Sequence, residues 1–221
     1  MTDASANPLL EAVAAAPEPD LSAFRDRLLD GLQRSIEERG YQETTVTDVV
    51  RHARASRRTF YLVFSTKDDC FVALMQAANR RLTQRIADAV DPAAPWQAQA
   101  RAAVEAYFDQ VASEPGLSRS WVREFPALGT VARQVHRDAV DALVTLVQRL
   151  TDTEQFRRDG LVPVSRELAL ILLGGLRELT ASVIEDGDDV RGVAEAGVAA
   201  TLALLATSRA SVGQNVPTEP S

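Results

Sequence analysis

The feature that most constrains the fold of this chain is the spacing of its apolar residues, which recur three or four positions apart along most of the sequence. The first such stripe, which stops at Gly40, consists of Leu21, Phe24, Leu28, Leu32 and Ile36. This period places apolar side chains on one face of an α-helix, whereas a half-buried strand needs strict alternation. No strand-like alternation stands out, so the spacing predicts an all-α fold.

Hydroxyl and acidic residues mark where several helices should begin. Thr45 and Asp48 resemble a capping box, and Ser56 and Ser165 are natural N-caps. Together with the apolar stripes, these signals predict about nine helices, near 21–40, 45–53, 56–64, from Ser65 or Thr66 nearly to Asp91, 95–113, 117–129, 130–150, 165–186 and from Asp188 or Asp189 to about 208. The polar stretch 151–164 is expected to be a loop.

The lengths of these helices indicate how the chain is organised. Three short helices are followed by longer ones, which is typical of a small head on a larger helical bundle. We therefore expect a helix-turn-helix DNA-binding domain over residues 21–66 and an effector-binding and dimerisation domain over 67–208. Residues 1–20 and 209–221 are poor in large apolar side chains and are expected to be a disordered arm and tail.

Composition limits the compartment and the chemistry. The single cysteine, Cys70, rules out an internal disulfide framework and suits a reducing cytosol. No basic leader with a long apolar run is visible, and the longest apolar stretches are too short to span a bilayer, so we expect a cytoplasmic protein with no membrane partner. Two distant histidines, no metal-ligand cluster and no catalytic motif argue against an enzyme, a metal site or a cofactor.

The segment SRRTFYLVFSTKDD at residues 56–69 concentrates basic side chains among aromatic ones. Between Arg51 and Lys67 there are five Lys or Arg residues and no Asp or Glu, in a chain of net charge −7. A local basic patch on an acidic body is typical of a protein that contacts DNA with one end. A solvated charged face is the alternative interpretation, and charge alone does not separate the two.

A helical wheel resolves this segment into two faces. Phe60, Val63 and Phe64 fall on one arc, whereas Arg58 lies on the opposite side, with Arg57 on one flank. Only two residues separate this helix from the preceding one, which is the compact spacing of a helix-turn-helix. In that motif the second helix enters the major groove, where arginine is the commonest reader of guanine.

The run GYQETTVTDVVRHARASRRTFYLVFSTKDDCF at residues 40–71 resembles the N-terminal signature of the TetR family of one-component transcriptional regulators. This resemblance implies DNA contacts by Thr45, Ser56, Arg57, Arg58, Thr59, Tyr61, Leu62 and Lys67. Thr45, Tyr61 and Lys67 would be phosphate anchors. The chain departs from the family pattern at three positions: Arg54 replaces the usual glycine of the turn, Arg58 a small residue and Val63 an aromatic one.

The resemblance also implies an effector cavity among the middle helices, where most of the remaining aromatic residues gather. The residues expected to line it for a small apolar or aromatic effector are Val104, Tyr107, Phe108, Trp121 and Phe125. The alternative is that these rings simply fill the core.

The last two long helices are the expected dimer interface. Residues 165–186 carry two apolar stripes and residues 189–208 are rich in Ala and Gly, so both helices can pack against a second copy. The interface residues expected are Leu172, Gly175, Leu179, Val183, Val198 and Leu202. A monomer with one central helix would give the same pattern.

Together these features predict a ligand-responsive repressor that binds a palindromic double-stranded DNA operator as a homodimer and is released by a small effector. The alternative is a TetR-like scaffold that binds ligands or proteins without sequence-specific DNA binding.

Overall fold

The computed structural model describes residues 21–208, so the predicted arm and tail lie outside the described part. Within it the chain forms ten α-helices, two short 3-10 helices and no β-strand, which confirms the all-α prediction. The helix beyond the predicted nine is α9 (Glu154–Arg158), inside the stretch expected to be a loop. Its Phe156 is buried against Trp96, with 6.4 Å between ring centroids, and this contact orders a segment that is polar in composition.

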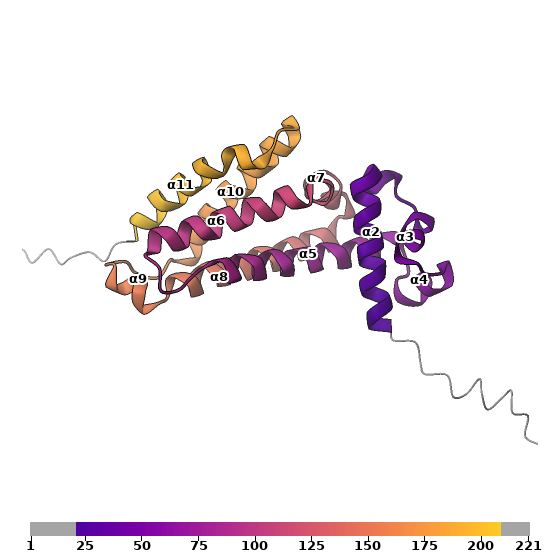
Figure 1. Cartoon of the computed structure of the whole chain (residues 1–221), viewed down its shortest axis with the longest axis horizontal. Coiled ribbons are helices and arrows are strands. Elements are labelled where there is room, and N and C mark those ends of the chain that lie inside the picture. The colour runs from indigo at the N-terminus through magenta and orange to yellow at the C-terminus, as the bar shows by residue number, and fades with distance from the viewer. Residues whose placement is uncertain (1–20, 209–221) are drawn as a thin grey trace, which may run out of the picture.

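The molecule is elongated, with a three-helix head at one end (Figure 1). The head consists of α2 (Leu21–Glu43), α3 (Val46–Ala53) and α4 (Arg57–Val63). The long helices of the body are α5 (Lys67–Ala89), α6 (Trp96–Ser113), α8 (Thr130–Thr151), α10 (Arg166–Asp186) and α11 (Ala194–Ala206). The short helix α7 (Pro115–Arg123) lies where the body meets α2, and α2 crosses the end of the body at a steep angle (Figure 1).

The predicted caps begin the helices of the head. Thr45 and Asp48 form a capping box at α3, and the Ser56 side chain accepts the Thr59 N–H at α4. Thr66 forms a second box at α5. These side chains satisfy backbone donors that a helix start leaves unpaired. The last helix begins later than predicted, because residues 190–193 form a 3-10 helix capped by Asp189.

The core of the head depends on close contact between α2 and α3. Leu28, Leu32, Val49 and Phe60 are fully buried in it. A Cβ at Gly31 would lie only 2.5 Å from the carbonyl oxygen of Val49. Glycine is therefore required here for its lack of a side chain, which lets the two backbones touch.

Aromatic packing and hydrogen bonds join the head to the body. The rings of Tyr41 and Phe71 stack with 3.8 Å between centroids, so the end of α2 sits on the first turns of α5. The carboxylate of Glu37 in α2 accepts the backbone N–H groups of Gly116 (2.8 Å) and Leu117 (3.0 Å). Because these are unpaired donors at the start of α7, Glu37 caps that helix from the head.

Candidate nucleic-acid interface and effector cavity

Helix α4 has the two faces that the wheel predicts. Phe60 and Phe64 are buried and Val63 packs partly buried against the same core. Arg57, Arg58, Tyr61 and Leu62 are exposed, Tyr61 and Leu62 by 52% and 61%. An exposed leucine and tyrosine beside two arginines make a surface that offers both hydrogen-bond donors and apolar contact, as a reader of base edges requires.

The turn before α4 is strained. Arg54 has φ 49° and ψ 46°, and it is the one non-glycine residue with positive φ between residues 21 and 208. A left-handed backbone brings Cβ close to the following carbonyl oxygen, which costs energy for any residue other than glycine. The resemblance to the TetR family implies glycine at this position, and a left-handed backbone is one that glycine adopts without cost.

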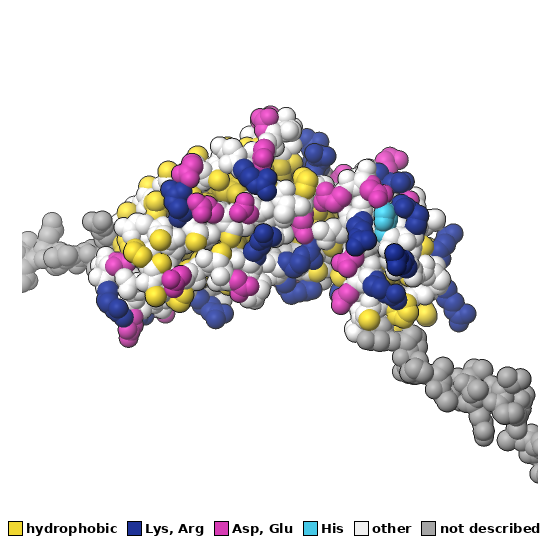
Figure 2. Space-filling view, in the orientation of Figure 1, with side chains coloured by type: hydrophobic (Ala, Val, Ile, Leu, Met, Phe, Trp, Pro, Cys, Tyr) yellow, Lys and Arg dark blue, Asp and Glu magenta, His cyan; other side chains and the backbone are white. Residues whose placement is uncertain are grey.

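Three of the five basic residues of this segment are free of internal partners within residues 21–208. Arg54, Arg57 and Arg58 have no ion pair there, whereas Arg51 lies 3.5 Å from Glu38 and also contacts Asp48. Figure 2 shows Lys and Arg side chains projecting from the outer end of the head. The free guanidinium groups therefore lie at and beside the start of α4, where the helix dipole also favours an anion.

The side chain of Lys67 is occupied inside the protein. Its Nζ donates hydrogen bonds to the carbonyl oxygens of Tyr41 (2.9 Å) and Thr44 (2.8 Å) and lies 4.2 Å from the centroid of the Tyr41 ring. Burial lowers the pKa of Lys67. Two of its three donors thus hold the end of α2, leaving one for the phosphate that the resemblance assigns to it.

The hydroxyl groups predicted to contact DNA also have local roles. Thr45 Oγ1 donates to Asp48 Oδ2 at 2.7 Å in its capping box, and it is exposed. Ser56 and Thr59 share a hydrogen bond of 2.8 Å between their hydroxyl oxygens. Each hydroxyl is thus held in one orientation at a helix start.

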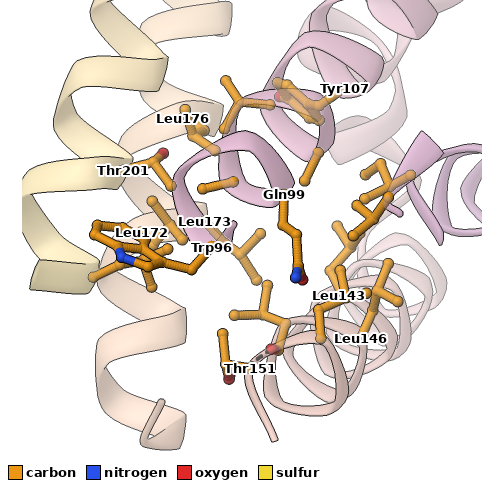
Figure 3. A pocket seen from close by; sticks show the side chains of 18 of the residues that line it. Trp96, Gln99, Tyr107, Leu143, Leu146, Thr151, Leu172, Leu173, Leu176 and Thr201 are labelled. Atoms are coloured by element: carbon orange, nitrogen blue, oxygen red, sulfur yellow. Dashed lines mark hydrogen bonds between the residues drawn. The ribbon is translucent and has the colours of Figure 1, made fainter. Parts of the chain in front are cut away.

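Two of the cavities in the body have mostly apolar linings. The Trp121 cavity, of about 330 Å³, is lined from α5, α6, α7, α8 and α10 and includes Met75, Asn79, Trp121, His136 and Arg177. The Trp96 cavity, of about 80 Å³, lies between α6, α8, α10 and α11 and is almost entirely apolar (Figure 3). Both fit the description of a ligand site as a mostly apolar hollow with a few polar groups.

The predicted pocket residues divide between cavity lining and core. Val104 and Tyr107 line the Trp96 cavity, and Tyr107 and Trp121 line the Trp121 cavity. Phe108 and Phe125 line neither. Phe108 is buried against Gly197, and Phe125 stacks on Trp121 with 4.8 Å between centroids. Phe108 and Phe125 therefore fill the core, which was the alternative to their lining an effector pocket.

Sequence reasoning did not predict that Asn79 and His136 line the Trp121 cavity. Asn79 lies in α5 between the apolar residues Met75 and Leu82, at helical spacing. His136 sits in the same way within α8, before Val140. A polar residue that interrupts an apolar stripe was the signal available, and it could have identified both.

The expected dimer residues are only partly available at the surface of the single chain. Leu172 and Val198 are buried in the core of the body, and Leu179, Val183 and Leu202 are half-buried. Of the six, Gly175 alone is exposed. The small or apolar residues that are exposed on α10 and α11 are Ile171, Gly174, Gly175, Ala196, Ala199, Ala200 and Ala203. In the single chain, most of the predicted interface residues therefore pack at least partly into the core.

Over residues 21–208 no cluster of metal-binding side chains is present, and none of the helices has the length and apolarity to cross a membrane.

Comparison with known proteins agrees with this geometry. The family model described as bacterial regulatory proteins of the tetR family matches residues 28–74, which contain α3, α4 and parts of α2 and α5. The HTH-type transcriptional regulator EthR of Mycolicibacterium smegmatis is 27% identical over 183 residues, covering 79% of this chain and 80% of that protein.

Solved structures share the fold over most of the chain. A TetR-family transcriptional regulator from Pectobacterium atrosepticum gives a TM-score of 0.66 at 26% identity, covering 88% of this chain and 98% of that one. The regulator FadR of Bacillus subtilis, solved in complex with stearoyl-CoA, gives 0.67 at 14% identity, covering 80% and 96%. The matched head, the homologue and the shared fold together support the TetR family of bacterial transcriptional regulators for this chain.

Proposed function

We propose that the protein is a ligand-responsive repressor that binds a palindromic operator as a homodimer and releases it when a small effector enters the body. The observation that carries the proposal is the outer face of α4. Arg57 and Arg58 are exposed there and have no internal ion pair within residues 21–208. Freely placed guanidinium groups at the start of a recognition helix suit guanine edges and phosphates.

In this proposal each function belongs to one predicted domain, with DNA binding in residues 21–66 and effector binding and dimerisation in 67–208. Helix α5 supports this coupling, because it begins at Lys67 on the head and lines the Trp121 cavity through Met75, Asn79 and Leu82. An effector that displaces α5 would change the distance between the two recognition helices of a dimer. Half-sites lie about 34 Å apart, so a small change weakens binding.

Selection of binding sites from a random duplex library, followed by anisotropy titrations at several salt concentrations, tests DNA recognition. We expect a palindromic site and an affinity that falls steeply with salt, because neutralised phosphates release counterions. Arg58→Ala should relax the preference at one base position in each half-site. Arg149→Ala, which removes the same charge from an exposed position on α8, should change nothing. Uniform weak affinity for every duplex would instead support the scaffold alternative.

The exposed face of α10 and α11 is the proposed dimer interface, revised from the sequence prediction. Its small side chains suit close helix packing, and Ile171 is 61% exposed in the single chain. A Cβ at Gly175 would meet nothing within 4 Å, so Gly175→Arg should leave the protomer folded while preventing association. Light scattering after gel filtration should show a monomer for Gly175→Arg and a dimer for the control Gln97→Arg, at an exposed site on α6. A dimeric Gly175→Arg variant would place the interface elsewhere.

A further inference from the structure

The Trp96 and Trp121 cavities meet at a shared set of side chains. Tyr107, Leu143, Leu173 and Leu176 line both of them. Three of the four are leucines, whose side chains can adopt other rotamers without moving the backbone. These four side chains form the wall between the two cavities. A long ligand could open this wall by changing the rotamers of its leucines.

The polar groups of the Trp96 cavity are already satisfied by the protein. Gln99 donates to two backbone carbonyl oxygens, at 2.7 and 3.3 Å. Thr151 and Thr201 donate to carbonyl oxygens of their own helices at 2.9 and 2.8 Å. A ligand in this cavity finds an apolar wall and no free side-chain donor among these three residues, which suits a hydrocarbon chain.

The Trp121 cavity is different, because one of its buried donors lacks a partner within residues 21–208. Asn79 Nδ2 is buried and makes no hydrogen bond within residues 21–208. Arg177 has one ion pair there, a long contact of 3.7 Å with its chain neighbour Glu178. His136 lies 6.0 Å from Trp121 between ring centroids, and burial followed by the charge of Arg177 lowers its pKa. Unpaired buried donors are costly unless an acceptor meets them.

The one carboxylate that lines this cavity does not cancel these donors. Glu114 Oε1 already accepts hydrogen bonds from Gln33 (2.9 Å) and from Arg81 (3.3 Å), which also makes an ion pair with it. Its charge is thus balanced at the head–body junction. The lining thus keeps the unpaired amide of Asn79, together with the Arg177 guanidinium and the His136 imidazole.

We propose that the two cavities form one site for an amphiphile, with its hydrocarbon tail in the Trp96 cavity and an anionic, hydrogen-bond-accepting head group in the Trp121 cavity. This proposal rests on the proposed function and names the chemical class of its effector. The head group would contact Asn79 of α5, the helix that begins at the DNA-binding head. Binding would therefore act on α5 directly.

The two tryptophans of the chain, one in each cavity, allow the orientation to be measured. Trp96→Phe leaves Trp121 as the reporter, and Trp121→Phe leaves Trp96. Bromine quenches tryptophan fluorescence at short range. We expect α-bromododecanoate to quench Trp121 and ω-bromododecanoate to quench Trp96. The opposite assignment, or no saturable quenching of either tryptophan, would overturn the proposal.

The head-group chemistry is tested by comparing dodecanoate with dodecanol and methyl dodecanoate by calorimetry. Loss of one charge-assisted contact should weaken dodecanoate binding about tenfold in Arg177→Gln, with little effect on dodecanol. Arg149→Gln, outside both cavities, is the matched control. Equal affinity of the wild-type protein for dodecanoate and dodecanol would contradict an anionic head-group site.

The outcome separates this proposal from the proposed function. If the protein binds an operator in a salt-sensitive way but does not bind dodecanoate, the proposed function is supported and the amphiphile site is refuted. If the protein binds dodecanoate in the expected orientation but recognises no operator, the amphiphile site is supported and the proposed repressor function is refuted.

Discussion

Gly31→Ala is the substitution whose consequence follows most directly from the structure. The added methyl carbon would lie 2.5 Å from the Val49 carbonyl oxygen and 3.1 Å from the Ala53 Cβ. Ordinary contact begins near 3.4 Å, so α2 and α3 must separate by nearly an ångström. Overpacking of this kind costs about 1–3 kcal/mol, and the better helix propensity of alanine returns about 0.5–1 kcal/mol.

The net loss should be centred on about 1 kcal/mol and reach at most about 2.5 kcal/mol, and each kcal/mol lowers Tm by about 2–4 °C for a chain of this size. Thermal unfolding followed by circular dichroism, at fixed protein concentration because association shifts Tm, measures it. Operator affinity should fall as well, since α3 carries the turn that orients α4. Asp30→Ala, one residue away on the exposed side of α2, should stay within about 0.5 kcal/mol of wild type. A Gly31→Ala variant as stable as wild type would refute the close approach of the two helices.

Three further outcomes are expected. Arg54→Gly should raise stability by up to about 1 kcal/mol by relieving the left-handed backbone, whereas Arg54→Ala, which keeps the Cβ, should give no gain; equal gains in thermal unfolding would point to charge instead. Glu37→Ala should cost about 1 kcal/mol and speed hydrogen exchange at the Gly116 and Leu117 amides, with Glu37→Gln intermediate, and unchanged exchange would contradict the cap. Burial raises the pKa of the Cys70 thiol to about 12, so its alkylation near neutral pH should require opening of the fold and accelerate with denaturant; fast labelling in native buffer would contradict its burial.

Local features of this protein could be predicted from the sequence because the residues that cause them lie close together in the chain. The predicted capping box at Thr45 involves an aspartate three residues further on. The inward turn of Phe60 and Phe64 follows from helical spacing alone. The same helical spacing places Arg57 and Arg58 away from the buried face, where they are exposed.

Other features depended on partners far away in the chain. Nothing in the sequence indicated that the Lys67 ammonium binds carbonyl oxygens at the end of α2, more than twenty residues earlier. Phe125 was read as pocket lining because it is aromatic, but Trp121 and Phe71 enclose it. For α10, apolar on both faces, the sequence pattern left open which face meets the core and which meets solvent.

The helical content, the helix starts of the head and the two-faced recognition helix were determined by the sequence, since each rests on backbone hydrogen bonding and side-chain period within one element. Tertiary structure alone decided the strained turn at Arg54, the capping of α7 by Glu37 and the unpaired amide of Asn79 beside Trp121. These arise where separate helices meet, and the packing of one helix against another sets which polar groups find partners.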